Sequence, residues 1–167
     1  MKLFMLILFS SVCITTNLFS QTSYTAYIFM AEECPVCNYL GKTLNKLSTE
    51  YQDDVKFIAV FPQRMSNYKT ASLFRKKYDL AFFDVEIDHD QSITKKYNAT
   101  VTPEVVLVDQ LDTILYQGRI NNSYAAPGRM RHGKVTEDLE KAIIMAIDGK
   151  SVSKPWPDPI GCYITRI

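Results

Sequence analysis

The sequence feature that most constrains the fold is a pair of cysteines, Cys34 and Cys37, between a strand-like run and a helix-like run. Residues 24–30, just before the pair, are rich in aromatic and β-branched side chains and carry no charge, which is typical of a strand buried on both faces. Residues 38–51, just after it, repeat apolar side chains at steps of three and four, which predicts an amphipathic helix. Pro35 suits the first turn of that helix, where an N–H group needs no partner within the helix. We therefore expect both cysteines at the N-terminal end of a helix that follows a central strand.

The spacing of the two cysteines gives them different expected roles in thiol chemistry. A helix dipole stabilises a thiolate at the helix N-terminus, so Cys34 is expected to attack and Cys37, one turn further in, to resolve the mixed disulfide. Glu32 and Glu33 are expected to tune the pair, because neighbouring carboxylates disfavour a thiolate. A structural disulfide and a zinc site remain as alternatives, although so short a loop constrains the unfolded chain little and zinc needs a second pair of ligands.

Strand-like and helix-like runs alternate along the rest of the chain. Residues 55–61 are β-rich, and two strands joined by a helix of this length predict a right-handed parallel βαβ unit. Ser66 and Asp90 are the expected capping residues of the next two helices. This order predicts a single α/β domain with a central mixed sheet and helices on both faces. The further elements expected are helices at residues 66–78, 90–97 and 135–147, strands at 82–87, 105–108 and 113–117, and a long loop at 121–133.

The first 20 residues differ in composition from the rest. Lys2 is their only charge, residues 3–9 are apolar, and the small Ser20 precedes Gln21, a pattern typical of a secretory signal peptide cleaved near Ser20–Gln21. An uncleaved membrane anchor is the alternative, although the apolar run is short for a bilayer. We therefore expect a signal peptide at residues 1–20, one domain at 21–150, a C-terminal tail at 151–167, and an exported protein, periplasmic or extracellular.

The charge balance limits the classes of partner. The 167 residues include 19 Lys and Arg against 18 Asp and Glu, so the chain carries no excess of basic side chains that would indicate a nucleic-acid partner. Contact with a membrane is expected only through the signal segment, if that segment stays uncleaved. Three cysteines, Cys34, Cys37 and Cys162, follow the signal segment, which for an exported protein means one pair and one odd thiol.

Two motifs in this order resemble the thioredoxin superfamily. The segment from Phe29 to Cys37 resembles the strand-to-helix junction that carries the family's C-x-x-C motif, and residues 96–109 resemble its short helix, cis-proline loop and strand. Residues 62–87 resemble the insertion that distinguishes the exported redoxin and TlpA-like branch, which is related to AhpC/TSA proteins. The resemblance covers residues 24–147 and implies a thioredoxin-like fold with an extra α-β insertion.

The resemblance also implies an activity, that of a thiol-disulfide oxidoreductase that needs no cofactor and no metal. Its substrates would be the thiols and disulfides of proteins or small molecules, and another redox protein would donate or accept electrons. Pro103 would be a cis-proline beside the cysteines, and the backbone of Thr102 would bind an extended substrate. Pro35 and Val36, between the two cysteines, would tune the site.

Three positions depart from the family's pattern. Met30 and Glu33 stand where the family usually has tryptophans, and Ile28 stands where thioredoxin has a buried aspartate. Two other functions therefore remain as alternatives, a non-catalytic binding module with a structural disulfide and a thiol peroxidase. Cys162 is either a second resolving thiol, an intermolecular bridge or a small buried side chain.

Overall fold

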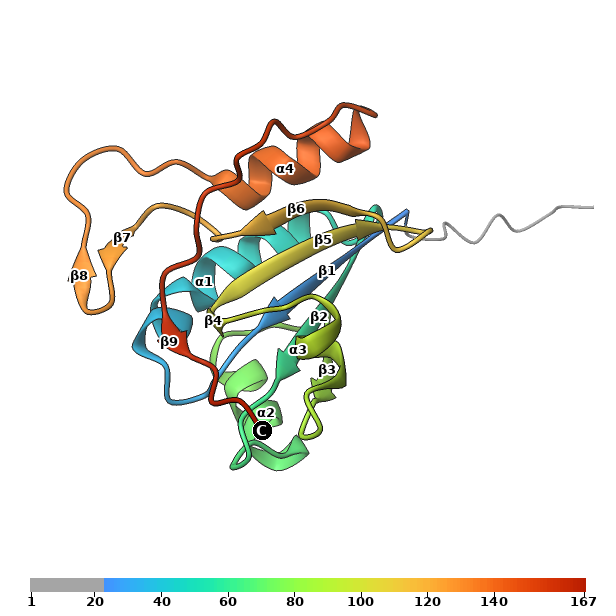
Figure 1. Ribbon diagram of the computed structural model, residues 1–167. Coiled ribbons are helices and arrows are strands. Elements are labelled where there is room, and N and C mark those ends of the chain that lie inside the picture. Colours follow the sequence, from blue (N-terminus) through green and yellow to red (C-terminus); the bar gives the residue numbers. More distant parts are fainter. Residues whose placement is uncertain (1–22) are drawn as a thin grey trace, which may run out of the picture.

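The computed structural model of the protein describes residues 23–167, so the expected signal peptide at residues 1–20 lies outside the described part. Figure 1 shows a layered arrangement in which helices flank one central sheet. In chain order the elements are β1 (Tyr24–Phe29), α1 (Pro35–Glu50), β2 (Val55–Phe61), α2 (Tyr68–Lys77), β3 (Phe83–Ile87), α3 (Ser92–Lys96), β4 (Val101–Thr102), β5 (Glu104–Asp109), β6 (Ile114–Gly118), β7 (Tyr124–Ala126), β8 (Arg129–Met130), α4 (Asp138–Ile147) and β9 (Cys162–Tyr163).

The central sheet has five strands in the order β3-β2-β1-β5-β6. The strands β1, β2 and β3 are parallel to one another, whereas β5 is antiparallel to β1 and β6 is antiparallel to β5. The sheet is therefore mixed and β1 is its central strand, as the sequence predicts. The run α2–β3, which adds the edge strand, corresponds to the expected α-β insertion.

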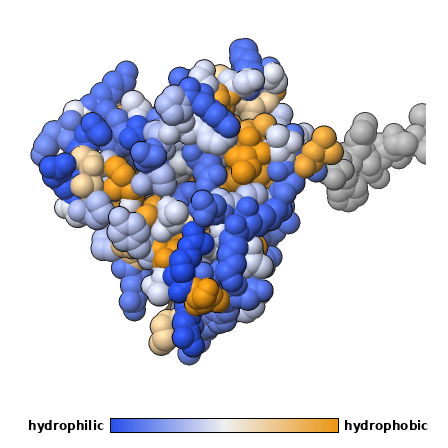
Figure 2. Space-filling model, viewed as in Figure 1, coloured by the Kyte–Doolittle hydropathy of each residue, from blue (hydrophilic) through white to orange (hydrophobic). Residues whose placement is uncertain are grey.

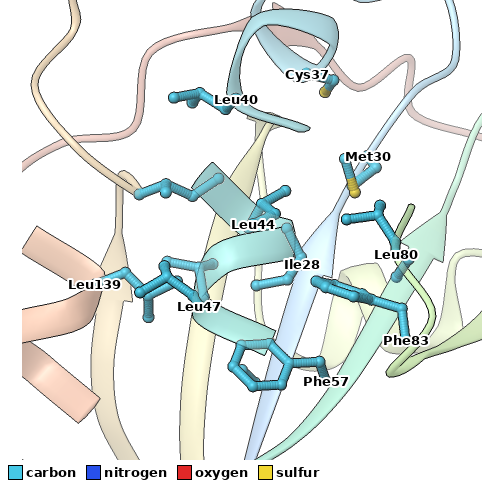
Figure 3. Packing of buried hydrophobic residues seen from close by; sticks show 14 of the residues in the cluster. Ile28, Met30, Cys37, Leu40, Leu44, Leu47, Phe57, Leu80, Phe83 and Leu139 are labelled. Atoms are coloured by element: carbon cyan, nitrogen blue, oxygen red, sulfur yellow. The ribbon is translucent and has the colours of Figure 1, made fainter. Parts of the chain in front are cut away.

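Two apolar clusters cover the two faces of the sheet. The larger cluster joins α1, α2 and α4 to one face, and Figure 3 shows Leu44 and Leu47 of α1 packed near Ile28 of β1. The smaller cluster, on the other face, includes Tyr97 after α3 and Ile164 from the C-terminal tail. Both faces are thus buried, which explains why β1 and β2 are apolar along most of their length. The prediction of an α/β fold with helices on both faces is confirmed.

The N-terminus of α2 differs from the predicted one. Asn67, not Ser66, caps the helix: its Oδ1 accepts hydrogen bonds from the backbone N–H groups of Lys69 and Thr70 at 3.0 and 3.1 Å. The Ser66 hydroxyl instead donates to Glu32 Oε2 at 2.7 Å. Ser66 is therefore committed to a contact across the fold, and the next residue with a capping side chain takes its place.

The short helix α3 also differs from its prediction at the N-terminus. Asp90 accepts a hydrogen bond from the backbone N–H of Ser92 at 3.1 Å, whereas the buried Asp88 accepts from the backbone N–H groups of Ile93 and Thr94 at 3.1 and 2.8 Å. Gln91, in the left-handed conformation with φ 56°, turns the chain so that the carboxylate of Asp88 faces the first turn. Asp88 is thus the residue that satisfies the free N–H groups of this helix.

Two segments predicted without strands contain them. The expected loop at residues 121–133 holds a small antiparallel hairpin of β7 and β8, which projects from the body in Figure 1. The tail at residues 151–167 ends in β9, which pairs with β4. The helix expected from Val135 begins at Asp138 instead, and the Val135 side chain is exposed. Among residues 23–167 the helices are all too short or too polar to cross a membrane.

The surface shown in Figure 2 is mainly hydrophilic, with apolar residues in separate patches. Small separate patches are ordinary for a folded domain and point to no particular partner.

Candidate active site

The C-x-x-C motif lies where β1 passes into α1. Cys34 is the N-cap residue of α1, and Pro35 follows in the first turn, so the helix begins at the cysteine pair as the sequence predicts. Cys34 is 2% exposed and Cys37 is fully buried. Figure 3 shows Cys37 at one end of the larger apolar cluster, near Met30. The two thiols are therefore placed unequally, Cys37 within the core and Cys34 at its boundary.

The loop before β5 faces the cysteine pair. The Thr102–Pro103 peptide bond is cis, and Thr102 is fully buried. The thiol of Cys34 donates a hydrogen bond to the Thr102 carbonyl oxygen, with 3.0 Å between sulfur and oxygen. Residues 68 positions apart in the sequence are thus joined directly at the site.

A third thiol reaches the same place. Cys162 lies opposite Thr102 in the β4–β9 pair and is partly buried against the larger apolar cluster. Cys34 and Cys162 both line a pocket of about 330 Å³, together with Glu32, Glu33, Met65 and other residues from the loops after β1 and β2. All three cysteines of the described part are free thiols. The site is therefore a cluster of three thiols rather than a pair.

The thiols have opposite pKa shifts. The pKa of Cys34 lies well below its usual value, chiefly because the Cys37 thiol donates a hydrogen bond to the Cys34 thiolate; burial opposes this, and the Cys162 thiol adds a second hydrogen bond. The pKa of Cys37 lies well above its usual value, mainly because of burial and then because its proton is held by Cys34. The shared hydrogen bonds therefore favour one thiolate, at Cys34.

The two glutamates next to the motif line the same pocket as Cys34 and Cys162. Glu32 accepts hydrogen bonds from the hydroxyls of Ser66 and Thr70 at 2.7 and 2.6 Å, so its carboxylate is held at the start of α2. The Glu33 side chain is exposed, and neither carboxylate is among the main causes of the Cys34 pKa shift. Between the cysteines, the Pro35 side chain is exposed and that of Val36 is buried.

Glu104 is a site residue that the sequence analysis missed. It follows Pro103 directly, is 3% exposed, and its Oε2 accepts hydrogen bonds from the backbone N–H groups of Thr100 and Val101 at 2.8 and 3.4 Å. Its Oε1 accepts from Gln117 Nε2 at 2.8 Å. The carboxylate therefore fixes both sides of the turn that carries Thr102. In the sequence, the only sign of this role is that Glu104 is a charged residue at the start of an otherwise apolar strand.

Several solved structures resemble this fold. No family model matches the chain, and no curated protein does. A hypothetical protein from Sinorhizobium meliloti has a similar structure, with a TM-score of 0.74 at 25% identity over 87% of this chain and 81% of that one. A secreted Mycobacterium tuberculosis disulfide oxidoreductase homologous to E. coli DsbE gives 0.55 at 19% identity over 74% and 81%. A thioredoxin-like protein in its oxidised form gives 0.57 at 16% identity over 78% and 82%. The chain has a thioredoxin-like fold.

A metal site is one of the two structural alternatives for the cysteines. Among residues 23–167, His, Cys, Asp and Glu side chains form no group of three or more that could hold a metal ion.

The lowered pKa of Cys34 predicts how its reactivity depends on pH. An ordinary thiol, with a pKa of about 8.5, loses reactivity steadily as the pH falls below that value. We expect alkylation of Cys34 in the reduced protein to stay near its maximal rate at neutral pH and to fall only as the pH passes through the lowered pKa. Iodoacetamide labelling with peptide mapping measures this profile. Cys37→Ala should shift the profile to higher pH, because it removes the main hydrogen-bond donor. A midpoint near about 8.5 in the wild type would contradict the prediction.

Proposed function

We propose that the protein is an exported thiol-disulfide oxidoreductase of the TlpA-like kind, which cycles Cys34 and Cys37 between dithiol and disulfide. The observation that carries the proposal is the position of Cys34 at the start of α1, beside the buried Cys37 and facing the loop of Thr102 and Pro103. The lowered pKa of Cys34 and the raised pKa of Cys37 agree with it. An attacking thiolate and a protonated second thiol within reach are the two requirements of disulfide exchange. The thioredoxin-like fold supports the proposal, and so does the M. tuberculosis disulfide oxidoreductase among the similar structures.

The proposed reaction uses the thiols in sequence. The Cys34 thiolate attacks one sulfur of a substrate disulfide, forms a mixed disulfide and releases the other sulfur as a thiolate. Cys37 then loses its proton and attacks Cys34, which forms the Cys34–Cys37 disulfide and releases the second substrate thiol. Two substrate thiols are produced and two protein thiols are oxidised, so a partner redox protein must supply electrons for the next cycle. The backbone of Thr102 and cis Pro103 would hold the substrate chain.

Export is supported by the composition of residues 1–20 and by the description of the M. tuberculosis protein as secreted. Proteins or small molecules with thiols and disulfides are the proposed substrates. A disulfide between Cys34 and Cys37 in an oxidising compartment would also fit the redox setting of exported proteins.

Equilibration in glutathione buffers of graded potential tests the proposed cycle. After acid quenching and alkylation, mass spectrometry should show a Cys34–Cys37 disulfide whose population changes across potentials above about −300 mV. A bridge that stays fully oxidised down to that potential would support a structural disulfide in a binding module instead. Consumption of hydrogen peroxide by the reduced protein should be no faster than by a free thiol, and a much faster rate would favour a thiol peroxidase.

A further inference from the structure

The C-terminal tail occupies the edge of the site. β9 runs antiparallel to β4, with Cys162 opposite Thr102 and Tyr163 opposite Val101. The Thr102 hydroxyl donates to the Cys162 carbonyl oxygen at 3.4 Å. Figure 1 shows β9 beside β4, near the N-terminal end of α1. The chain thus lays its own extended segment, with a cysteine in it, on the strand that precedes Pro103.

The packing at Gly161 fixes this position closely. A Cβ atom at residue 161 would lie 2.0 Å from the Thr102 carbonyl oxygen, so a glycine is required for the tail backbone to approach so near. The same oxygen accepts the hydrogen bond from Cys34 at 3.0 Å. Thr102 therefore lies between the Cys34 thiol and the start of β9, which brings Cys162 to the site in a defined register.

Access to the site distinguishes Cys162 from Cys37. Cys162 lines the pocket of about 330 Å³ together with Cys34, whereas Cys37 is fully buried and does not line it. A group that reaches Cys34 through this pocket therefore also meets Cys162. Two thiols approach Cys34, one from the core and one from the pocket.

We propose that Cys162 is a second disulfide partner of Cys34, so that the site closes either a Cys34–Cys37 or a Cys34–Cys162 disulfide. This inference rests on the proposed attack of Cys34 on substrate disulfides. Cys162 is then a catalytic thiol. The strand β9, which belongs to the same chain, holds Cys162 where an extended substrate would otherwise pair with β4.

The step balances without a further reactant. Once Cys34 carries a substrate thiol in a mixed disulfide, Cys162 releases its proton to solvent and its thiolate attacks the Cys34 sulfur. The Cys34–Cys162 bond forms, the bond to the substrate breaks, and the substrate leaves as a thiolate that takes up a proton. The external disulfide is reduced by two electrons to two thiols, and Cys34 and Cys162 are oxidised.

The charge on Cys34 determines when Cys162 can lose its proton. Burial, followed by the hydrogen bond and the charge of the Cys34 thiolate, raises the pKa of Cys162 to about 11. The two contributions from Cys34 vanish when that thiolate becomes part of a mixed disulfide. Cys162 is thus held protonated until Cys34 has reacted, and becomes easier to ionise afterwards.

The lifetime of a mixed disulfide tests the proposal. Reduced Cys37→Ala and Cys37→Ala/Cys162→Ala proteins are mixed with oxidised glutathione, quenched in acid at intervals, alkylated and weighed by mass spectrometry. In Cys37→Ala the glutathione adduct on Cys34 should give way to a Cys34–Cys162 disulfide. In the double variant the adduct should persist at least about tenfold longer, because the intramolecular attack is lost. Peptide mapping identifies the linked residues.

A matched control distinguishes the loss of the Cys162 thiol from a general effect of changing a residue in β9. Cys37→Ala/Tyr163→Ala changes the next residue of β9, which is 81% exposed, and should show the same short adduct lifetime as Cys37→Ala. If Cys37 variants fold poorly, the same mapping on wild-type protein with excess oxidised glutathione should recover some Cys34–Cys162 linkage. Equal adduct lifetimes in the single and double variants would overturn the proposed role of Cys162 but not the proposed function. Absence of any adduct on Cys34 in every variant would overturn the proposed function as well.

Discussion

Replacing Cys34 by alanine is expected to lower the rate of protein-disulfide reduction by on the order of 100-fold or more, because the attacking thiolate is lost. Cys37 cannot take over, since it is fully buried and its pKa is raised well above the usual value. The measurement is the rate of insulin reduction with dithiothreitol as the electron donor, compared between wild-type and Cys34→Ala proteins.

A surface variant controls for indirect effects on this rate. Glu86→Ala changes an exposed residue on the edge strand β3, remote in the sheet order from the site strand β5, and should leave the rate unchanged. Circular dichroism should show that both variants keep the wild-type fold. Undiminished activity in Cys34→Ala would remove Cys34 from the reaction and with it the proposed cycle.

Replacing Glu104 by alanine is expected to lower the free energy of unfolding by about 2–4 kcal/mol, because buried donors lose a charged acceptor. The backbone N–H groups of Thr100 and Val101 would lose their bonds to the carboxylate, and so would the Gln117 side chain. The same change should slow disulfide reduction, since these bonds fix the turn that carries Thr102. Urea unfolding, followed by circular dichroism, measures the change in stability.

A graded series makes the Glu104 prediction specific. Glu104→Gln keeps one oxygen acceptor for the backbone N–H groups but places a donor toward the Gln117 amide, so its loss of stability should be intermediate. Glu86→Ala removes an exposed carboxylate and should change the unfolding free energy by within about 0.5 kcal/mol. A Glu104→Ala protein as stable as Glu86→Ala would show that the buried carboxylate does not hold the turn.

The presence of β9 on β4 has a consequence for substrates. The tail strand and an extended substrate cannot pair with the same edge of β4 at one time, because each backbone group there has one partner. In the proposed cycle, small disulfides would reach Cys34 through the pocket that Cys162 also lines, while the tail stays in place. A protein substrate that pairs with β4 would first have to displace residues 161–163, so the tail would select among substrates by size.

Local sequence patterns were sufficient for the main elements of the fold. The uncharged aromatic run of β1 and the three-and-four spacing of α1 depend on neighbours in the chain, so both were predicted within a few residues of their observed ends. The position of Cys34 at the start of α1 followed from the same local pattern, with Pro35 as a further signal. The helix caps were wrong where a distant partner competed, as Glu32 does for Ser66.

The sequence by itself determined the α/β order, the central strand and the place of the cysteine pair, because these depend on contacts within a few residues. Only the tertiary structure decided which groups surround Cys34. The Thr102 carbonyl meets Cys34 across 68 residues, and Cys162 meets Thr102 across 60. Such contacts arise when separate strands pack, and no periodicity in the tail signals them. Cys162, which has no cysteine near it in the sequence, is thus the third thiol of the site because β9 pairs with β4.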